Sequence, residues 1–499
     1  MAPTSSRSAR RWSWLPWLPW LPWLPWRSLR PGHWWAQSRS GCSSSDRPNH
    51  PRRRRIRLPG PARPPPPTRP TLASRDPTGL APLGTCAVTS DARATYSRPH
   101  DRPHLPRHWP ARRRRPRRPG RQAGRGCPLG RGPPHRRLGP LNTNAFPSLG
   151  EIQSELCGWV ADLFHGPEAA GFLTSGGTES ILLAVKAARD RALAERGVTA
   201  PEIVLADTAH AAFHKGAHLF GLTVRRVPVG PDLTADVDGM AAAVGPDTAL
   251  VVGSAVDYPN GLVDPIPDLA ALAASVGANC HVDACMGGFV LPFAEMEGRE
   301  VPAWDFRTDG VSTISADIHK LGYAPKGVSV LLHADRDLRR HQTFVFDDWL
   351  GGLYATPNLQ GTRSGLPMAA AWAVVRHLGR DGYRRLVRAT LEAADRIRAG
   401  VRAIDGLSVP GDPRHHLLSI TADPAADVPV SIPALGEALA ARHWHLDRQG
   451  PPDGLHLTVS AGNVPTVNEW LADLSDAVVE AQERGNIDPA DDGSYATLE

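Results

Sequence analysis

Short apolar runs alternate with helical stretches through most of the chain after residue 139, and this alternation limits the fold more than any other feature. The runs have the length and the apolar, β-branched character of buried strands: 202–207, 223–229, 249–256, 280–285, 311–317 and 328–334. Strands that alternate with helices form a mostly parallel sheet covered by helices on both faces. The sequence therefore predicts an α/β fold, in which ligands bind at the carboxyl ends of the strands.

Helices are predicted on either side of these strands. Between 148 and 164 the apolar side chains recur on one helical face: Ile152, Leu156, Trp159, Val160 and Leu163. Another helix is expected from Thr178. Further on, the pattern predicts a long helix, a strand at 417–422 and two amphipathic segments near the end. We expect a large domain over 139–376 and a smaller C-terminal α+β domain over 377–499.

Residues 1–138 differ from the rest in composition. They contain 30 Arg and 4 Asp but no Lys or Glu, a net charge of +26, whereas the remaining residues have a net charge of −19. Proline at every third position of the "WLPWLPWLPWLPW" run at 14–26 argues against a transmembrane span and a signal peptide. We expect a disordered extension or a segment that is not native coding sequence. A nucleic-acid-binding tail is the alternative, but an acidic globular part would repel phosphate backbones, so we expect no nucleic-acid partner.

The six cysteines divide evenly between residues 1–138 and the rest, and no C-x-x-C pair occurs. This spacing is typical neither of a disulfide framework nor of a zinc ribbon. We therefore expect the protein in a reducing cytoplasm.

A glycine pair in "TSGGTES" (174–180) precedes the helix expected from Thr178. Free backbone N–H groups and the helix dipole favour a phosphate at such a position, which places Gly177 and Thr178 in a candidate phosphate cradle. No Gly-Lys pair follows, which excludes a nucleotide P-loop. The alternative is a capped helix start without a ligand.

Three histidines recur four residues apart in "DTAHAAFHKGAH" (207–218): His210, His214 and His218. They could lie on one helical face and bind a metal, but no carboxylate or cysteine pair supports such a site. We favour the interpretation that His210, nearest the strand end, presents its flat ring to a flat ligand. The other two histidines are then solvated.

An acid and an amine follow two of the predicted strands. Asp283 in "CHVDACMGG" ends an apolar run, where a buried carboxylate needs a partner such as a cationic ring nitrogen. His319 and Lys320 lie in "SADIHKLGYAPKG" (315–327), together with Lys326, and the whole chain has only two further lysines. A desolvated lysine can lose its proton and form a Schiff base with an aldehyde, which arginine cannot do. A structural core carboxylate and a solvated loop charge are the alternatives for Asp283 and Lys326.

A phosphate cradle, a flat histidine, a buried carboxylate and an amine together describe a site for pyridoxal 5′-phosphate. The segments that carry these groups resemble the group II pyridoxal-phosphate-dependent decarboxylases between about residues 142 and 376. The matching segments are "AFPSL", "TSGGTESI", "AHAAFHK", "HVDACMGGF", "DFRTDGVSTISADIHKLGYAPKG" and "WLGGLYATPNLQGTRSG". Within that family the chain is most similar to the carbon–carbon lyases that cleave phosphorylated long-chain amino alcohols.

The resemblance implies an aspartate-aminotransferase-like fold (fold type I) and a homodimer with active sites between the subunits. Carried over position by position, it implies Lys320 as the Schiff-base lysine, Asp283 as the partner of the pyridine nitrogen, His210 as the stacking ring, Gly177, Thr178 and His319 as phosphate-holding residues, and Tyr258 and Lys326 on the substrate side.

The leading hypothesis is therefore a lyase of sphingolipid metabolism that acts on a small-molecule substrate. Its products would be an aldehyde and phosphoethanolamine. One alternative is an amino-acid decarboxylase that uses the same cofactor. A second is a catalytically impaired cofactor-binding protein, because residues 1–138 do not resemble the N-terminal arm of the family.

Overall fold

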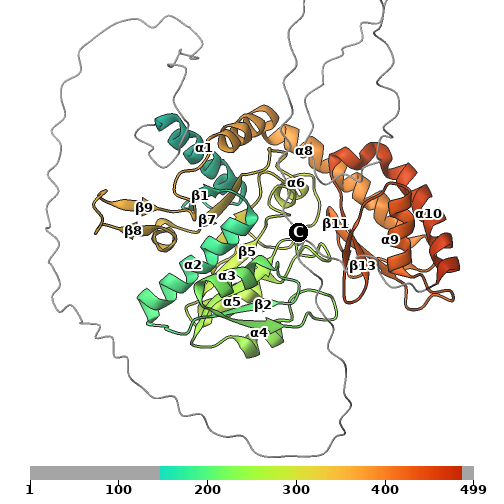
Figure 1. The fold of residues 1–499 in the computed structure, drawn as a ribbon, viewed down its shortest axis with the longest axis horizontal. Helices are drawn as coiled ribbons and strands as arrows, with labels where there is room; N and C mark the ends of the chain where they lie inside the picture. Colours follow the sequence, from blue (N-terminus) through green and yellow to red (C-terminus); the bar gives the residue numbers. More distant parts are fainter. Residues whose placement is uncertain (1–145, 486–499) are drawn as a thin grey trace, which may run out of the picture. The chain divides into compact units, whose positions relative to one another are not determined.

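The computed structural model describes residues 146–485, which all lie in one compact unit (Figure 1). The expectations for residues 1–138 therefore lie outside the described residues. None of the helices in the described part combines the length and the apolarity that crossing a membrane requires.

A seven-stranded sheet lies at the centre of the fold, with the strand order β1-β7-β6-β5-β4-β2-β3. Its strands are β1 Ala170–Thr174, β2 Glu202–Ala206, β3 Thr223–Val227, β4 Thr248–Ser254, β5 Asn279–Asp283, β6 Val311–Ala316 and β7 Ser329–His333. Only β7 runs antiparallel to its neighbours. The mostly parallel sheet predicted from the six apolar runs is confirmed, and β1 is the strand that the prediction lacked.

Helices cover both faces of the sheet, as the alternating pattern predicts. They are α1 Pro147–Leu163, α2 Gly177–Arg196, α3 Ala212–Phe220, α4 Val237–Ala243, α5 Ile266–Ser275 and α6 Leu291–Met296. Successive side chains of a strand point to opposite faces. In β2, Ile203 and Leu205 accordingly pack in the cluster that contains Ile181 of α2, whereas Val204 packs in the cluster that contains Leu269 of α5. Burial on both faces explains why β2 and β4 to β7 read as apolar runs, whereas the edge strand β3 is mostly exposed.

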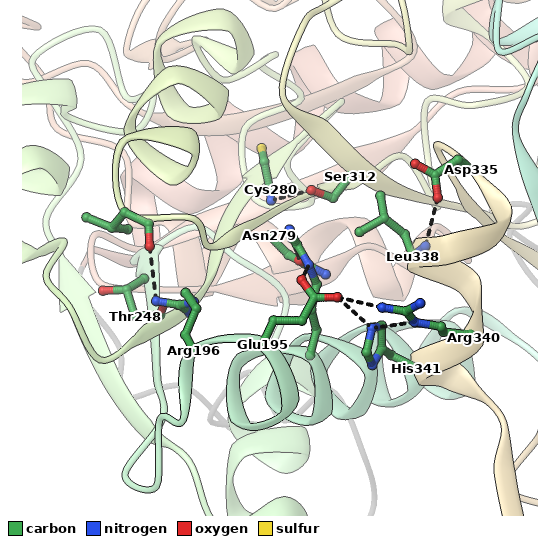
Figure 2. Close-up of polar contacts among 12 residues, drawn as sticks. Glu195, Arg196, Thr248, Asn279, Cys280, Ser312, Asp335, Leu338, Arg340 and His341 are labelled. Atoms are coloured by element: carbon green, nitrogen blue, oxygen red, sulfur yellow. Dashed lines mark hydrogen bonds and ion pairs between the residues drawn. The ribbon is translucent and has the colours of Figure 1, made fainter. Parts of the chain in front are cut away.

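The last turn of α2 is fastened at the amino edge of the sheet (Figure 2). Arg196 donates to the carbonyl of Thr248, the first residue of β4, at 2.6 Å. Glu195 accepts from Arg340 at 2.9 Å and lies 3.1 Å from His341 Nε2. These contacts fix the carboxyl end of α2 at the amino edge of the sheet. The amino end of α2 lies at the opposite edge, where the carboxyl ends of the strands can contact a ligand.

A second, smaller core lies in the C-terminal part of the described residues. We call the elements around this core the small domain, and those around the seven-stranded sheet the large domain. Its elements are α8 Leu366–Arg402, β10 Leu407–Ser408, β11 Leu417–Ala422, α9 Ile432–Ala441, β12 Asp447–Gln449, β13 Gly454–Thr458, η2 Ala461–Thr466 and α10 Val467–Arg484. The strands form an antiparallel sheet in the order β10-β11-β13-β12. The strand predicted at 417–422 is confirmed as β11. The long helix α8 is kinked at Gly379 (φ 54°) and contributes side chains to both cores.

A short segment between β7 and α8 contains the remaining elements of the described residues. It consists of α7 Arg336–Arg339, η1 Arg340–Gln342, β8 Phe344–Phe346 and β9 Tyr354–Thr356. The two strands pair only with each other and extend away from β1 and β7 (Figure 1).

The buried ionisable groups predict a maximum of stability near pH 6.5. Burial lowers the pKa of five histidines to about 3 or 4: His281, His333, His415, His416 and His456. Between about pH 4 and the unfolded value of about 6.5, the unfolded chain binds more of these protons, so stability rises with pH. Burial and the charge of Asp264 raise the pKa of Asp257 to about 8. The native state holds one extra proton on Asp257 between about pH 4 and pH 8, so stability falls over the upper part of this range, where the histidines no longer contribute.

Thermal unfolding of residues 139–499, followed between pH 4.5 and 8.5, checks this expectation. Asp257→Asn should flatten the alkaline decline and steepen the rise on the acid side, because the native state holds an extra proton on Asp257 from about pH 4 to about pH 8. An unfolding temperature that still rises between pH 6.5 and 8 would contradict the assignment.

Candidate active site

The groups singled out from the sequence meet at the carboxyl edge of the large sheet. Asp283 is the last residue of β5, and Lys320 lies four residues beyond the end of β6. His210 lies between β2 and α3, and Gly177 is the first residue of α2. The charge of Lys320 influences the titration of His210, and that of Asp283 influences Lys320. The topology therefore brings together side chains that are more than a hundred positions apart.

The amino end of α2 has the features of an anion site. Its first turn has free backbone N–H groups, as every helix start does, and no side chain caps it. Thr178 in this turn is exposed. A Cβ on Gly176 would lie 3.3 Å from Cε1 of His319, so the His319 ring borders this turn. The geometry agrees with the expected phosphate cradle of Gly177, Thr178 and His319, although their roles stay predictions.

Asp283 is buried and hydrogen-bonded at one of its oxygens. Its Oδ1 accepts from the backbone N–H of Cys285 at 3.0 Å and from the Ser315 hydroxyl at 3.2 Å. Only 7% of the residue is exposed. Two donors on one oxygen fix the orientation of the carboxylate.

The hydrogen bonding of His210 shows which of its ring nitrogens is the acceptor. Its Nδ1 accepts from the backbone N–H of Ala212 at 3.0 Å, which leaves the other ring nitrogen to carry the proton. Burial lowers the pKa of His210, so the ring is neutral at pH 7. His214 and His218 are both exposed, and residues 146–485 contain no cluster of three side chains that could bind a metal.

Lys320 forms a buried ion pair that the sequence did not predict. Its Nζ lies 3.0 Å from Oδ2 of Asp317, and Asp317 is only 2% exposed. Burial is the largest single influence on the pKa of Lys320 and lowers it, but the charge and hydrogen bond of Asp317, together with the charges of Cys285 and Asp283, outweigh burial, so the pKa is raised. The expectation that desolvation deprotonates this amine is therefore wrong for the protein without its ligand. The reason is the neighbouring carboxylate.

The two residues expected on the substrate side occupy different surroundings. Lys326 is exposed, and partial burial of its amine together with the charge of Lys320 lowers its pKa. The Tyr258 hydroxyl donates to Oδ2 of Asp447 at 2.9 Å, and its ring stacks on His456 at 4.0 Å. Tyr258 thus connects the loop after β4 to the small domain. Its contact with a substrate stays a prediction.

A cavity of about 650 Å³ lies between the loops after β2 and β4 and the small domain, and both His210 and Tyr258 line it. The volume suits a small organic ligand. His210 is therefore accessible from a sizeable space.

Sequence reasoning missed two carboxylates of the site. Asp317 follows an apolar strand in the same way as Asp283, so the same rule could have found it. Glu179 lies in the first turn of α2 and had no such signal. Its Oε2 accepts from Ser175 N at 2.6 Å, and its Oε1 accepts from Leu359 N at 3.0 Å. Glu179 therefore fastens the segment after β9 to the phosphate cradle.

These residues fit pyridoxal 5′-phosphate. An uncapped helix start suits its phosphate, the oriented carboxylate of Asp283 suits a pyridinium, and the Lys320 amine suits an aldehyde. The flat, neutral ring of His210 suits stacking on an aromatic face.

Known proteins agree with this fit. The family described as "Pyridoxal-dependent decarboxylase conserved domain" matches residues 140–421. The chain is 39% identical over 345 residues to sphingosine-1-phosphate lyase of Oryza sativa, which covers 68% of this chain and 63% of the rice protein. It is 35% identical over 361 residues to the Saccharomyces cerevisiae lyase, which covers 71% and 60%. The chain thus spans less than two thirds of the length of these relatives.

Solved structures show the same architecture. The Burkholderia pseudomallei sphingosine-1-phosphate lyase has a TM-score of 0.67 and 40% identity, over 70% of this chain and 81% of that chain. Lactobacillus brevis glutamate decarboxylase, at 23% identity and a TM-score of 0.62, shares the fold over 70% and 84%. With its mostly parallel, helix-covered sheet of fold type I, the chain belongs to the pyridoxal-dependent decarboxylase family, whose cofactor is pyridoxal 5′-phosphate.

Proposed function

We propose that the protein is a carbon–carbon lyase that cleaves a phosphorylated long-chain amino alcohol into an aldehyde and phosphoethanolamine. The observation that carries this proposal is the pair of lysines in one stretch at the carboxyl edge of the sheet. Lys320 is partly buried, with 16% of its side chain exposed, and is paired with Asp317, whereas Lys326 is exposed and has its pKa lowered by partial burial of its amine and by the nearby charge of Lys320. A second cation beside the cofactor lysine suits a substrate that carries its own phosphate. The similarity to several sphingosine-1-phosphate lyases supports the same reaction.

The cofactor, when bound, draws electrons from a bond at the carbon that bears the substrate amine. Lys320 supplies the amine that receives the cofactor aldehyde, and Asp283 keeps a proton on the ring nitrogen. His210 covers the ring face and excludes water from it. The amino end of α2 and His319 bind the cofactor phosphate.

Which bond of the substrate breaks would depend on how the residues of this chain hold the substrate. We propose that Lys326 binds the substrate phosphate and that Tyr258 contacts the 3-hydroxyl, which must lose a proton when the Cα–Cβ bond breaks. Tyr258 is already hydrogen-bonded to the carboxylate of Asp447, which can accept a proton passed on by the phenol.

The reaction is tested by supplying sphingosine-1-phosphate and a panel of amino acids separately to the cofactor-loaded protein. We expect aldehyde from the former and little carbon dioxide from the latter. Carbon dioxide without aldehyde would make the protein an amino-acid decarboxylase. Loading of the cofactor without either product would identify a catalytically impaired protein.

The two lysines are separated by substitution. Lys320→Ala should lose both the visible absorption band of the bound cofactor and turnover, because the amine is the attachment point. Lys326→Ala should keep the band and raise KM by about 10- to 100-fold, as expected for the loss of a charge-assisted contact of about 1.5–3 kcal/mol. Borohydride reduction followed by peptide mapping shows which lysine carries the cofactor. Label on Lys326 would refute the assignment.

We also propose that the protein is a homodimer that uses the β8–β9 hairpin. Apolar side chains of this hairpin are each more than half exposed: Phe344, Val345, Trp349, Leu350 and Leu353. An isolated two-stranded hairpin is marginally stable, and a contiguous apolar patch marks an interaction site. The segment after β9 is tied to the phosphate cradle through Glu179, so a second copy seated on the hairpin would lie next to the active site.

Sedimentation of the wild type and of the double variant Trp349→Ser, Leu350→Ser tests the interface. We expect a dimer for the wild type and a monomer for the variant. Val479→Ser, an exposed apolar residue on α10, is the matched control and should stay dimeric. A monomeric wild type at micromolar concentration would contradict the proposal.

We further propose a reducing compartment, the cytoplasm, as the site of action. Within the described residues, Cys157, Cys280 and Cys285 are buried free thiols. Such thiols persist where glutathione keeps the surroundings reducing.

A further inference from the structure

We propose that Asp317 is a positioning residue that holds the Lys320 amine protonated and in place until the cofactor arrives, so that loading the cofactor requires the release of a proton. The two side chains lie in one turn after β6, three residues apart, with 3.0 Å between Lys320 Nζ and Asp317 Oδ2. This role concerns the protein before the cofactor binds. Its importance for the reaction rests on the proposed function, in which Lys320 carries the cofactor.

The burial of Asp317 shows that the carboxylate is built into the site. Only 2% of the residue is exposed, and its Oδ1 has no hydrogen-bond partner within residues 146–485. Leaving a buried charged oxygen without a donor is costly unless nearby positive charge compensates. Lys320 supplies that charge at Oδ2, and His319 Nε2 lies 3.7 Å from the same oxygen.

Gly177 gives the carboxylate its space at the amino end of α2. A Cβ on Gly177 would lie 2.9 Å from Asp317 Oδ2 and 3.0 Å from Oδ1, which is closer than real Cβ contacts. Gly177 is not among the glycines with a positive φ, so the backbone does not require glycine here. The requirement comes from space. The first turn of α2, with its positive dipole end, is therefore a second source of compensation for Asp317.

Both members of the pair are held in their charged forms. Burial raises the pKa of Asp317, but the charges of Lys320 and His319, together with hydrogen bonds from Ser329 and Lys320, outweigh burial and the pKa is lowered. The pKa of Lys320 is raised, as described above. The other titratable groups coupled to this pair come from four places: His319 and Lys326 on the same loop, Asp283 and Cys285 at the end of β5, His210 after β2, and His416 directly before β11.

An ammonium cannot attack an aldehyde, because the lone pair of the nitrogen is bound to the proton. Lys320 must therefore lose one proton before it can react, and the nearest acceptor is Asp317 Oδ2. The ion pair thus holds the amine in a fixed position and also lowers the fraction of the amine that is unprotonated and reactive at neutral pH.

Acetylation of the cofactor-free protein tests this role directly. Acetic anhydride reacts with unprotonated amines, and peptide mass spectrometry resolves all four lysines of the chain. Each pKa unit removed raises the reactive fraction tenfold below the pKa. We expect Asp317→Asn to increase the acetylation rate of Lys320 at pH 7.5 by at least about tenfold. The acetylation rate of the exposed Lys215 serves as the internal reference for the amount of active reagent.

The chain offers a matched control. Asp190 pairs with Lys186 at 2.9 Å in an i,i+4 arrangement that is partly exposed. Asp190→Asn removes the same charge from an equally short pair, and we expect it to leave the rate at Lys320 unchanged. The pH profile separates charge from loosened packing, because Asp317→Asn should move the midpoint of the Lys320 profile down and keep its plateau.

Equal Lys320 profiles in the wild type and in Asp317→Asn would overturn the proposal, and so would a higher plateau with an unmoved midpoint. If Asp317→Asn does not fold, Gly177→Ala provides the second test, because its Cβ would displace the carboxylate and should also lower the Lys320 midpoint. The uptake of cofactor gives an independent readout. Its rate should rise with pH between 7 and 9 in the wild type and depend less on pH in Asp317→Asn.

Discussion

Charges buried at the carboxyl edge of the sheet must be compensated, and this requirement shapes the site. A carboxylate withdrawn from water needs hydrogen-bond donors or a counter-charge. Asp283 takes donors from Cys285 and Ser315, and Asp317 takes the ammonium of Lys320. The loops after the strands supply these partners. Their conformations therefore follow from the charges as much as from the apolar core beneath.

A related requirement, that buried carboxyl oxygens find hydrogen-bond donors, organises the loop after β4. Asp257 accepts from the backbone N–H groups of Asn260 and Leu262, each at 2.7 Å, which folds the loop back on itself. Gly261 lets this loop approach the small domain, since a Cβ there would lie 2.3 Å from the carbonyl oxygen of Leu417. Tyr258 then reaches Asp447 across the cavity. A buried carboxylate in the large domain thus determines where a small-domain strand meets the site.

The sequence predicted the regular elements and the residues whose chemistry has few substitutes. Apolar runs revealed six strands because both faces of the sheet are buried, and Lys320 stood out because lysine is rare in the chain. The short strand β1 was missed because Gly171 and flanking glycine-rich turns weaken its pattern. The pairing of Asp317 with Lys320 was missed for another reason. Sequence shows which charges exist, whereas the sign of a pKa shift depends on distances of a few ångströms between them.

The helix α8 has a consequence for how the protein can be divided. The part of this helix up to Leu391, with Tyr383 and Val387, packs on the large core, and its last turns, with Ile397 and Val401, pack on the small one. A gene fragment that ends inside this helix would remove a wall from one core or leave an apolar stripe uncovered on the other. The two parts are therefore not interchangeable modules. Exchange of a C-terminal domain between relatives would need to carry the whole of α8 with it.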